Sequence, residues 1–187
     1  MKTALLVIDY INGIINGSCK DYVSRHPIVK HTNELIAHCR QKNIPIYFMR
    51  LAFDKNYTGL PKYSNGFNAI KQNNLFQIGN SDAEFISELD IKADDIVINK
   101  TAASPFHSIG LADALRSKNT ERLIFAGVAT DNAINIGVRE AHDNGYYTII
   151  AQDACGASSD EFHYWSIELL KKIANEILTV DALIQKL

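Results

Sequence analysis

A chain of 187 residues, 47% of them hydrophobic, is long enough to bury one sizeable core and falls within the usual range of a single domain. Its 19 basic and 21 acidic residues leave a formal charge of −2 with no basic block, which argues against nucleic acid as a partner. The apolar run at the N-terminus is broken at Asp9, too early for a signal segment or a membrane span. We therefore expect one cytoplasmic domain over residues 1–187 that binds neither nucleic acid nor membrane.

Cysteine and histidine residues show no metal-binding pattern. Cys19, Cys39 and Cys155 have unrelated spacings and no C-x-x-C pair, which favours free thiols in a reducing compartment. His31 and His38 lie two turns apart on a predicted helix without a carboxylate partner, so we interpret them as solvated helix residues.

The first half of the chain alternates apolar runs with amphipathic or irregular segments. Ala4–Ile8 is a continuous apolar run that predicts a strand buried on both faces, with Asp9 at its carboxyl end. A loop or short helical turns follow, and then the pattern predicts a helix over His26–Asn43 and a strand over Pro45–Met49. Farther along, a capping-box pattern predicts a short helix over Ser81–Leu89.

The second half continues the alternation. Strands are predicted over Asp95–Asn99, Leu123–Ala126, Tyr147–Ala151 and Ile177–Val180, and helices over Leu111–Arg116 and from Ile134 to Ala141. A further helix after Ser159 is expected to bury a stripe of Trp165, Ile167, Leu170 and Ile173. Because parallel neighbours need crossover connections, this order predicts a three-layer α/β/α, Rossmann-like fold with a mostly parallel six-stranded sheet.

Two features are open to two interpretations each. The stretch Leu51–Asn80 has scattered aromatic residues and no sustained periodicity. A loop this long can cover a pocket and supply aromatic walls, or it can be a surface excursion with an apolar cluster of its own. Phe106 can likewise line a compact pocket for a small planar or neutral molecule, or it can belong to the core.

Residues that can take part in catalysis follow three of the predicted strands and should meet at one edge of the sheet. Asp9 follows the first strand, Lys100 follows the third, and the turn Gly127–Ala133 follows the fourth. A protonated lysine beside a thiol favours thiolate, a carboxylate can take the thiol proton and return it to a leaving group, and amides at a helix start can stabilise an oxyanion. A purely structural Asp–Lys ion pair is the alternative.

These residues resemble the isochorismatase-like cysteine hydrolases, a family that includes nicotinamidases, carbamoylsarcosine amidohydrolases and isochorismatases. The resemblance covers essentially the whole chain. It rests on Asp9 in LLVIDY, Lys100 in INKTAASPF and the turn Gly127-Val128-Ala129-Thr130-Asp131, with further matches at Ala141, Gly145, Asp153-Ala154 and His163. It implies that Asp9 and Lys100 are catalytic.

The same resemblance implies a cysteine nucleophile two residues after Asp131, where this chain has Ala133. It also implies a cis peptide bond at Val128–Ala129 and an oxyanion hole made by the amides of Ala129 and residue 133. Substrate contacts are expected from Asn12, Phe106, Thr130 and Asn132.

The chain departs from the family pattern at two places. Leu51-Ala52-Phe53-Asp54-Lys55 stands where nicotinamidases have an Asp-x-His metal site, so we expect no metal and no cofactor. Asp9-Tyr10-Ile11-Asn12 lacks the glutamine of many members and keeps only Asn12. By resemblance alone, a homodimer or homotetramer is expected in which a neighbouring subunit closes the pocket.

Three functions therefore remain open. The first is a hydrolase of a small amide or other C–N bond by an Asp-Lys-Cys mechanism, here inactivated because Ala133 lacks the thiol. The second is an isochorismatase-type vinyl-ether hydrolase, which works without the cysteine and uses the aspartate as an acid. The third is a non-catalytic pseudoenzyme that binds a small molecule. Thr130-Asp131-Asn132 resembles the cysteine-dependent branch, which favours the first.

Overall fold

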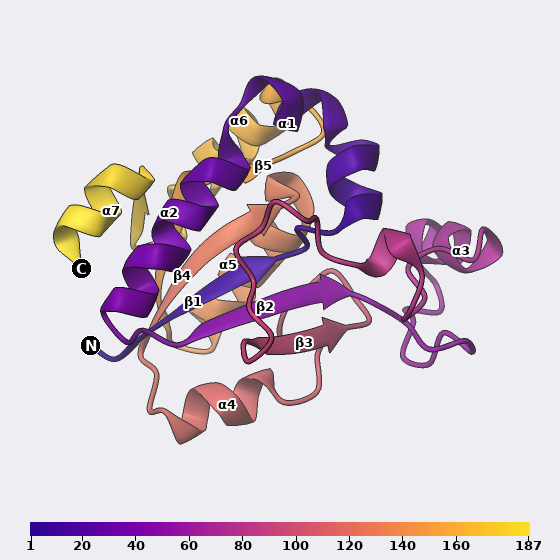
Figure 1. Ribbon diagram of the computed structural model, residues 1–187, viewed down its shortest axis with the longest axis horizontal. Helices are drawn as coiled ribbons and strands as arrows, with labels where there is room; N and C mark the ends of the chain where they lie inside the picture. The colour runs from indigo at the N-terminus through magenta and orange to yellow at the C-terminus, as the bar shows by residue number, and fades with distance from the viewer.

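The computed structural model describes residues 1–187 and is organised around one six-stranded sheet. Its strands are β1 (Thr3–Ile8), β2 (Ile46–Leu51), β3 (Ile96–Lys100), β4 (Arg122–Val128), β5 (Tyr147–Gly156) and β6 (Glu176–Leu178). They lie in the order β3-β2-β1-β4-β5-β6, and every neighbouring pair is parallel. All carboxyl ends therefore meet at one edge, and the arrowheads of β1, β2 and β3 point toward the same side of the molecule in Figure 1.

Helices cover both faces of the sheet. They are α1 (Lys20–Arg25), α2 (Ile28–Gln41), α3 (Asn65–Gln72), α4 (Leu111–Ser117), α5 (Asn135–Asp143), α6 (Asp160–Leu170) and α7 (Val180–Lys186). Residues of α2 and α7 pack on one face, and residues of α4, α5 and α6 pack on the other. Figure 1 shows the sheet between α2 and α5. The predicted three-layer α/β/α fold is confirmed, with the sheet wholly parallel.

The central strand β1 shows why the sequence produces this arrangement. Residues 4–8 are all apolar and have no exposed surface, because helices cover both sides of the strand. A parallel strand needs a crossover connection to the next strand. Helix α2 supplies it after β1, α4 after β3 and α5 after β4, each with its apolar face turned toward the sheet. None of the helices is long and apolar enough to cross a membrane.

The helix predicted over Ser81–Leu89 is wrong. Only Ser81–Ala83 forms a single 3₁₀ turn; Glu84 is extended, and a turn in which the Leu89 amide donates to the Ile86 carbonyl follows. Backbone groups of these residues bond instead to the segment after β1, since the amide of Ile86 donates to the Tyr10 carbonyl (3.0 Å) and the amide of Asn12 donates to the Glu84 carbonyl (2.9 Å). These long-range hydrogen bonds override the local capping pattern.

Two further expectations need correction on the outer elements. Trp165 is 57% exposed, whereas Ile167 and Leu170 are buried as predicted. The reason is geometric, because Trp165 lies on the opposite side of α6 from the stripe that packs on the sheet. Helices α3 and α7 were not anticipated, since both are short and their sequences lack a clear periodic run.

The stretch Leu51–Asn80 forms an excursion with its own apolar cluster. Phe53, Tyr57 and Phe76 are buried against one another and against α3. Of the two interpretations of this stretch, the structure favours the separate cluster, because these aromatic rings pack against other residues of the excursion. Figure 1 places α3 on the side toward which the strands point.

One glycine lets β4 approach β1 just before Asp9. Gly127 of β4 is in register with Ile8 of β1 and has φ +154°. A Cβ at this position would lie 2.4 Å from the Ile8 carbonyl oxygen. We expect Gly127→Ala to lower the free energy of unfolding by about 2 kcal/mol or more, because backbone strain and a backbone clash combine. Urea denaturation measures this change.

The matched control is Gly66→Ala, in α3, where a new Cβ meets nothing within 4 Å. That substitution is expected to be neutral or to stabilise by up to about 1 kcal/mol through helix propensity. Equal effects of the two substitutions would contradict the close approach of β4 to β1.

Candidate active site

A buried ion pair joins the ends of β1 and β3. Lys100 Nζ lies 2.7 Å from Asp9 Oδ2, and the two side chains are only 1% and 3% exposed. Although β1 and β3 are not neighbours, β2 lies between them and its last residue, Leu51, is in register with Lys100. The Leu51 amide donates to Asp9 Oδ1 at 2.8 Å, so three adjacent strands build the pair.

Lys100 has all three ammonium hydrogens accounted for. Besides Asp9, its Nζ donates to the carbonyl oxygens of Ala102 (3.0 Å) and Ala103 (3.2 Å) in the loop that follows β3. Three acceptors around a buried amine match the three donors of the charged form. The arrangement therefore holds a protonated lysine against the Asp9 carboxyl group.

The backbone of Asp9 turns its side chain out of β1 toward this lysine. Asp9 has φ +58°, a left-handed conformation that aspartate tolerates better than most residues. Burial raises the pKa of its carboxyl group above the ordinary value, while the charge and hydrogen bond of Lys100 and the Leu51 amide act in the opposite direction. A carboxyl group of raised pKa is suited to taking up and returning a proton.

The turn after β4 lies beside Asp9, because Ile8 is in register with Gly127. Its Val128–Ala129 peptide bond is cis, and a π-helical turn over Thr130–Ile134 leads into α5. Ala133 is buried among apolar residues of the α4–α6 face. The side chain at the expected nucleophile position is thus a methyl group in a closed environment.

Of the three cysteines, Cys19 is the one whose pKa is raised not only by burial but also by the negative charges of this site. It lies at the start of α1, fully buried, where burial raises its pKa to about 11 and the negative charges of Asp131 and Asp9 add to the rise. Cys39 and Cys155 are also buried, and burial raises the pKa of each to about 12. All three are neutral thiols at pH 7, so none supplies the missing thiolate.

The other predicted site residues are placed as follows. Thr130 is fully buried and bonds to His163, whereas Asn132 is exposed at the surface of the turn. Asn12 donates its side-chain amide to the Ser81 carbonyl (3.0 Å), which ties it to the neighbouring segment. The structure brings Asp9 and Lys100 into direct contact and leaves Asn12 engaged elsewhere.

Phe106 occupies a boundary position. Its ring stacks on Tyr146 at 6.0 Å and packs on the core, which agrees with the core interpretation. Phe106 also lines a hollow of about 720 Å³ together with Ala52 and Thr101. Both lie close to Lys100, because the Ala52 amide donates to the Lys100 carbonyl and Thr101 is the next residue in the chain.

Asp54 stands in the place of the metal site of nicotinamidases. Its side chain accepts hydrogen bonds from the backbone amides of Asn56 (2.8 Å) and Thr58 (3.0 Å) and so closes its own turn.

Comparison with known proteins identifies the family to which this sequence belongs. The isochorismatase domain model matches residues 3–182. The chain belongs to the isochorismatase family. A ureidoacrylate amidohydrolase, RutB, from Acinetobacter baylyi is 27% identical over 190 residues, which cover 91% of this chain and 77% of that protein.

Solved structures share the fold of this isochorismatase-family chain. A cysteine hydrolase from Pseudomonas syringae pv. phaseolicola superposes with a TM-score of 0.86 at 19% identity, covering 98% of this chain and 91% of the other. N-carbamoylsarcosine amidase from Thermoplasma acidophilum gives a TM-score of 0.75 at 20% identity, covering 97% and 98%. The family resemblance seen in the sequence is confirmed.

Several groups at this site were missed by sequence reasoning. The Leu51 amide and the carbonyls of Ala102 and Ala103 are backbone atoms, and backbone atoms leave no mark in residue types. The bond between Thr130 and His163 joins residues 33 positions apart. Only the folded chain identifies these partners.

We expect Lys100→Met to lower the free energy of unfolding by about 3–5 kcal/mol at pH 7, because it leaves the Asp9 carboxylate buried without its cation. Removing the lysine charge raises the pKa of Asp9 further. When the pKa of an acid is raised in the folded state, the free energy of unfolding decreases as the pH rises through that pKa. The loss of stability in Lys100→Met should therefore become smaller as the pH falls from 7 toward 5. Urea denaturation at both pH values tests this.

The control is the exposed pair of Arg116 and Asp113, whose side chains are 77% and 83% exposed. Arg116→Met is expected to change stability by less than about 1 kcal/mol and with no comparable pH dependence. A deficit in Lys100→Met that stays constant between pH 7 and pH 5 would show that Asp9 does not titrate in this range.

Proposed function

We propose that this chain binds a small amide or related C–N compound in a site built for Asp-Lys-Cys hydrolysis. In this site Ala133 takes the place of the nucleophile. The observation that carries the proposal is the buried 2.7 Å pair of Lys100 and Asp9 beside a turn that presents a methyl group. The relatives named ureidoacrylate amidohydrolase, and the fold neighbour named N-carbamoylsarcosine amidase, support C–N chemistry.

The chemistry follows from the groups present once a thiol stands at position 133. Asp9 takes the thiol proton, the sulfur forms a bond to the substrate carbonyl carbon, and the oxyanion lies against the amides of Ala129 and residue 133. The C–N bond then breaks as Asp9 gives its proton to the leaving nitrogen, and water hydrolyses the thioester. Lys100 stabilises the charged form of Asp9 during the first step.

A methyl group at position 133 stops this sequence at binding. Alanine has the volume to leave the packing around the turn intact, but it offers neither a proton to Asp9 nor an electron pair to the substrate. The chain with Ala133 is therefore expected to bind such substrates without forming the covalent intermediate.

We expect Ala133→Cys to create hydrolysis of at least one member of a panel of ureido acids, N-carbamoyl amino acids and small amides. Removing a nucleophile typically costs about 10⁴- to 10⁶-fold in kcat, so the gain over the parent should exceed about 10³-fold. Ala133→Cys combined with Asp9→Asn should remain inactive, because no base then takes the thiol proton. Product release measured by chromatography decides between these outcomes.

Alkylation provides a readout that needs no substrate. The three natural thiols are buried and neutral at pH 7, so iodoacetamide should leave the parent chain unmodified in its intact mass. The Ala133→Cys variant should gain one adduct faster than the parent, because the proposed pairing with Asp9 and Lys100 gives this buried thiol a thiolate character that the natural thiols lack. A variant that is neither alkylated nor active on the panel would contradict an activated thiol site.

A second candidate function is vinyl-ether hydrolysis without cysteine. The raised pKa of Asp9, caused by burial, favours it, because an aspartic acid can protonate the carbon–carbon double bond of an enol ether before water adds. If this function holds, the parent chain with Ala133 hydrolyses isochorismate, and Asp9→Asn abolishes the reaction. Pyruvate formation coupled to lactate dehydrogenase measures it, and no turnover by the parent chain rules this candidate out.

A further inference from the structure

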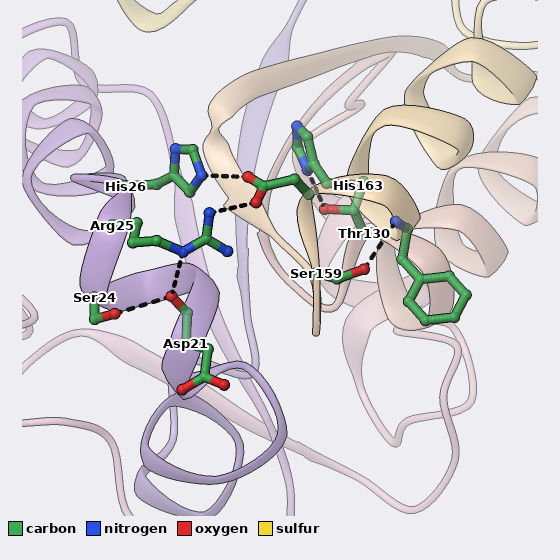
Figure 2. Close-up of polar contacts among 9 residues, drawn as sticks. Asp21, Ser24, Arg25, His26, Thr130, Ser159 and His163 are labelled. Atoms are coloured by element: carbon green, nitrogen blue, oxygen red, sulfur yellow. Dashed lines mark hydrogen bonds and ion pairs between the residues drawn. The ribbon is translucent and has the colours of Figure 1, made fainter.

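The turn that follows β4 is held by a side chain of α6. Thr130 is completely buried, and its Oγ1 lies 2.9 Å from Nδ1 of His163. Figure 2 shows this contact, with the two side chains directed toward each other. Since Thr130 begins the turn that ends in Ala133 and Ile134, the hydrogen bond fixes the start of the segment that carries the nucleophile position.

The imidazole of His163 is itself fixed by aromatic packing. The Tyr22 ring lies 5.3 Å from the His163 ring and 4.1 Å from the His26 ring. Burial raises the pKa of Tyr22 to about 12, so the ring remains a neutral phenol. Gly156, in register with Val128, lies so close that a Cβ there would be 3.0 Å from a Tyr22 ring carbon. Tyr22 thus contacts both His163 and the strand beside the turn.

An ion-pair cluster joins α1 to α6 at the same place. Asp160, the first residue of α6, accepts hydrogen bonds from Arg25 and from His26 Nε2 (2.6 Å). The hydrogen bonds from Arg25 and His26 hold the pKa of Asp160 below its usual value, so the carboxylate stays charged. Figure 2 shows Arg25, at the end of α1, and His26, which follows it, facing the start of α6. His163 is therefore held at the junction of two helices.

We infer that His163 is a positioning residue of the site, which sets the Thr130 hydroxyl and through it the turn that carries residue 133. This inference rests on the proposed function for its consequence in catalysis. Burial, with the nearby His26 as a smaller cause, lowers the pKa of His163 while Asp160 acts in the opposite direction, and the lowered pKa favours a neutral ring near pH 7. A neutral imidazole can accept a hydrogen bond from the Thr130 hydroxyl at Nδ1, whereas an imidazolium can only donate one.

The first test uses the parent chain and needs no activity. We expect amide hydrogen exchange of residues 129–134 to accelerate about tenfold or more in His163→Ala and in Thr130→Val, because the hydrogen bond that closes the turn is lost. Amides of β1 and α2 should keep their parent rates. Thr130→Val removes the hydroxyl but keeps the side-chain shape. If His163→Ala destabilises the whole of α6, Thr130→Val still shows whether loss of this hydrogen bond accelerates exchange in residues 129–134. His142→Asn, on the exposed surface of α5, is the control and should change neither region.

The second test uses the Ala133→Cys background. We expect His163→Ala to lower kcat about 10- to 100-fold with little change in KM, since misplacement of a reacting group slows the chemical step more than binding. His163→Asn places an amide group near the position of Nδ1 and should restore most of the rate. A structural role alone would predict no such rescue and no split between kcat and KM.

The outcomes separate the two proposals. If Ala133→Cys hydrolyses nothing, the proposed function fails, and the exchange rates of residues 129–134 still decide whether His163 positions the turn. Parent-like exchange in both His163→Ala and Thr130→Val overturns the inference. So does acceleration that spreads equally to β1 and α2, because that pattern reports global destabilisation.

Discussion

The ion pair between Lys100 and Asp9 is the constraint on which the rest of this site depends. Removing two charges from water is costly, and the cost is recovered only when every donor and acceptor of the pair has a partner. Here the ammonium group has three oxygen acceptors and the carboxylate has the Leu51 amide as well. Those partners come from β1, β2, β3 and the loop after β3, so the pair exists only when the strands take this order.

The turn after β4 adds a second element to the same edge. Gly127 allows β4 to lie against Ile8 without a side chain between them, and Ala133 follows within one turn. Ala133 packs among the buried apolar residues on the α4–α6 face of the sheet and offers a substrate no nucleophilic atom. The fold and the charged pair are therefore both formed in a chain that has no thiol at this position.

Elements far from the pair contribute by holding backbone in place. Helices α1 and α6 are joined by Asp160 with Arg25 and His26, and they present Tyr22 and His163 to the turn. The loop after Lys100 is tied to α5 through Ser104 and Glu140. Each of these contacts joins residues distant in sequence, and each bears on a segment that carries a site residue.

The sequence by itself determined the alternation of strands and helices and the placement of Asp9 and Lys100 at strand ends, because hydrophobic periodicity and strand termini are local properties. It also located Ala133 by resemblance. It could not determine the backbone partners of the ion pair, the irregular course of Ser81–Leu89, the exposure of Trp165 or the contact of His163 with Thr130. Those features depend on which distant residues meet in space, and only the tertiary structure decides that.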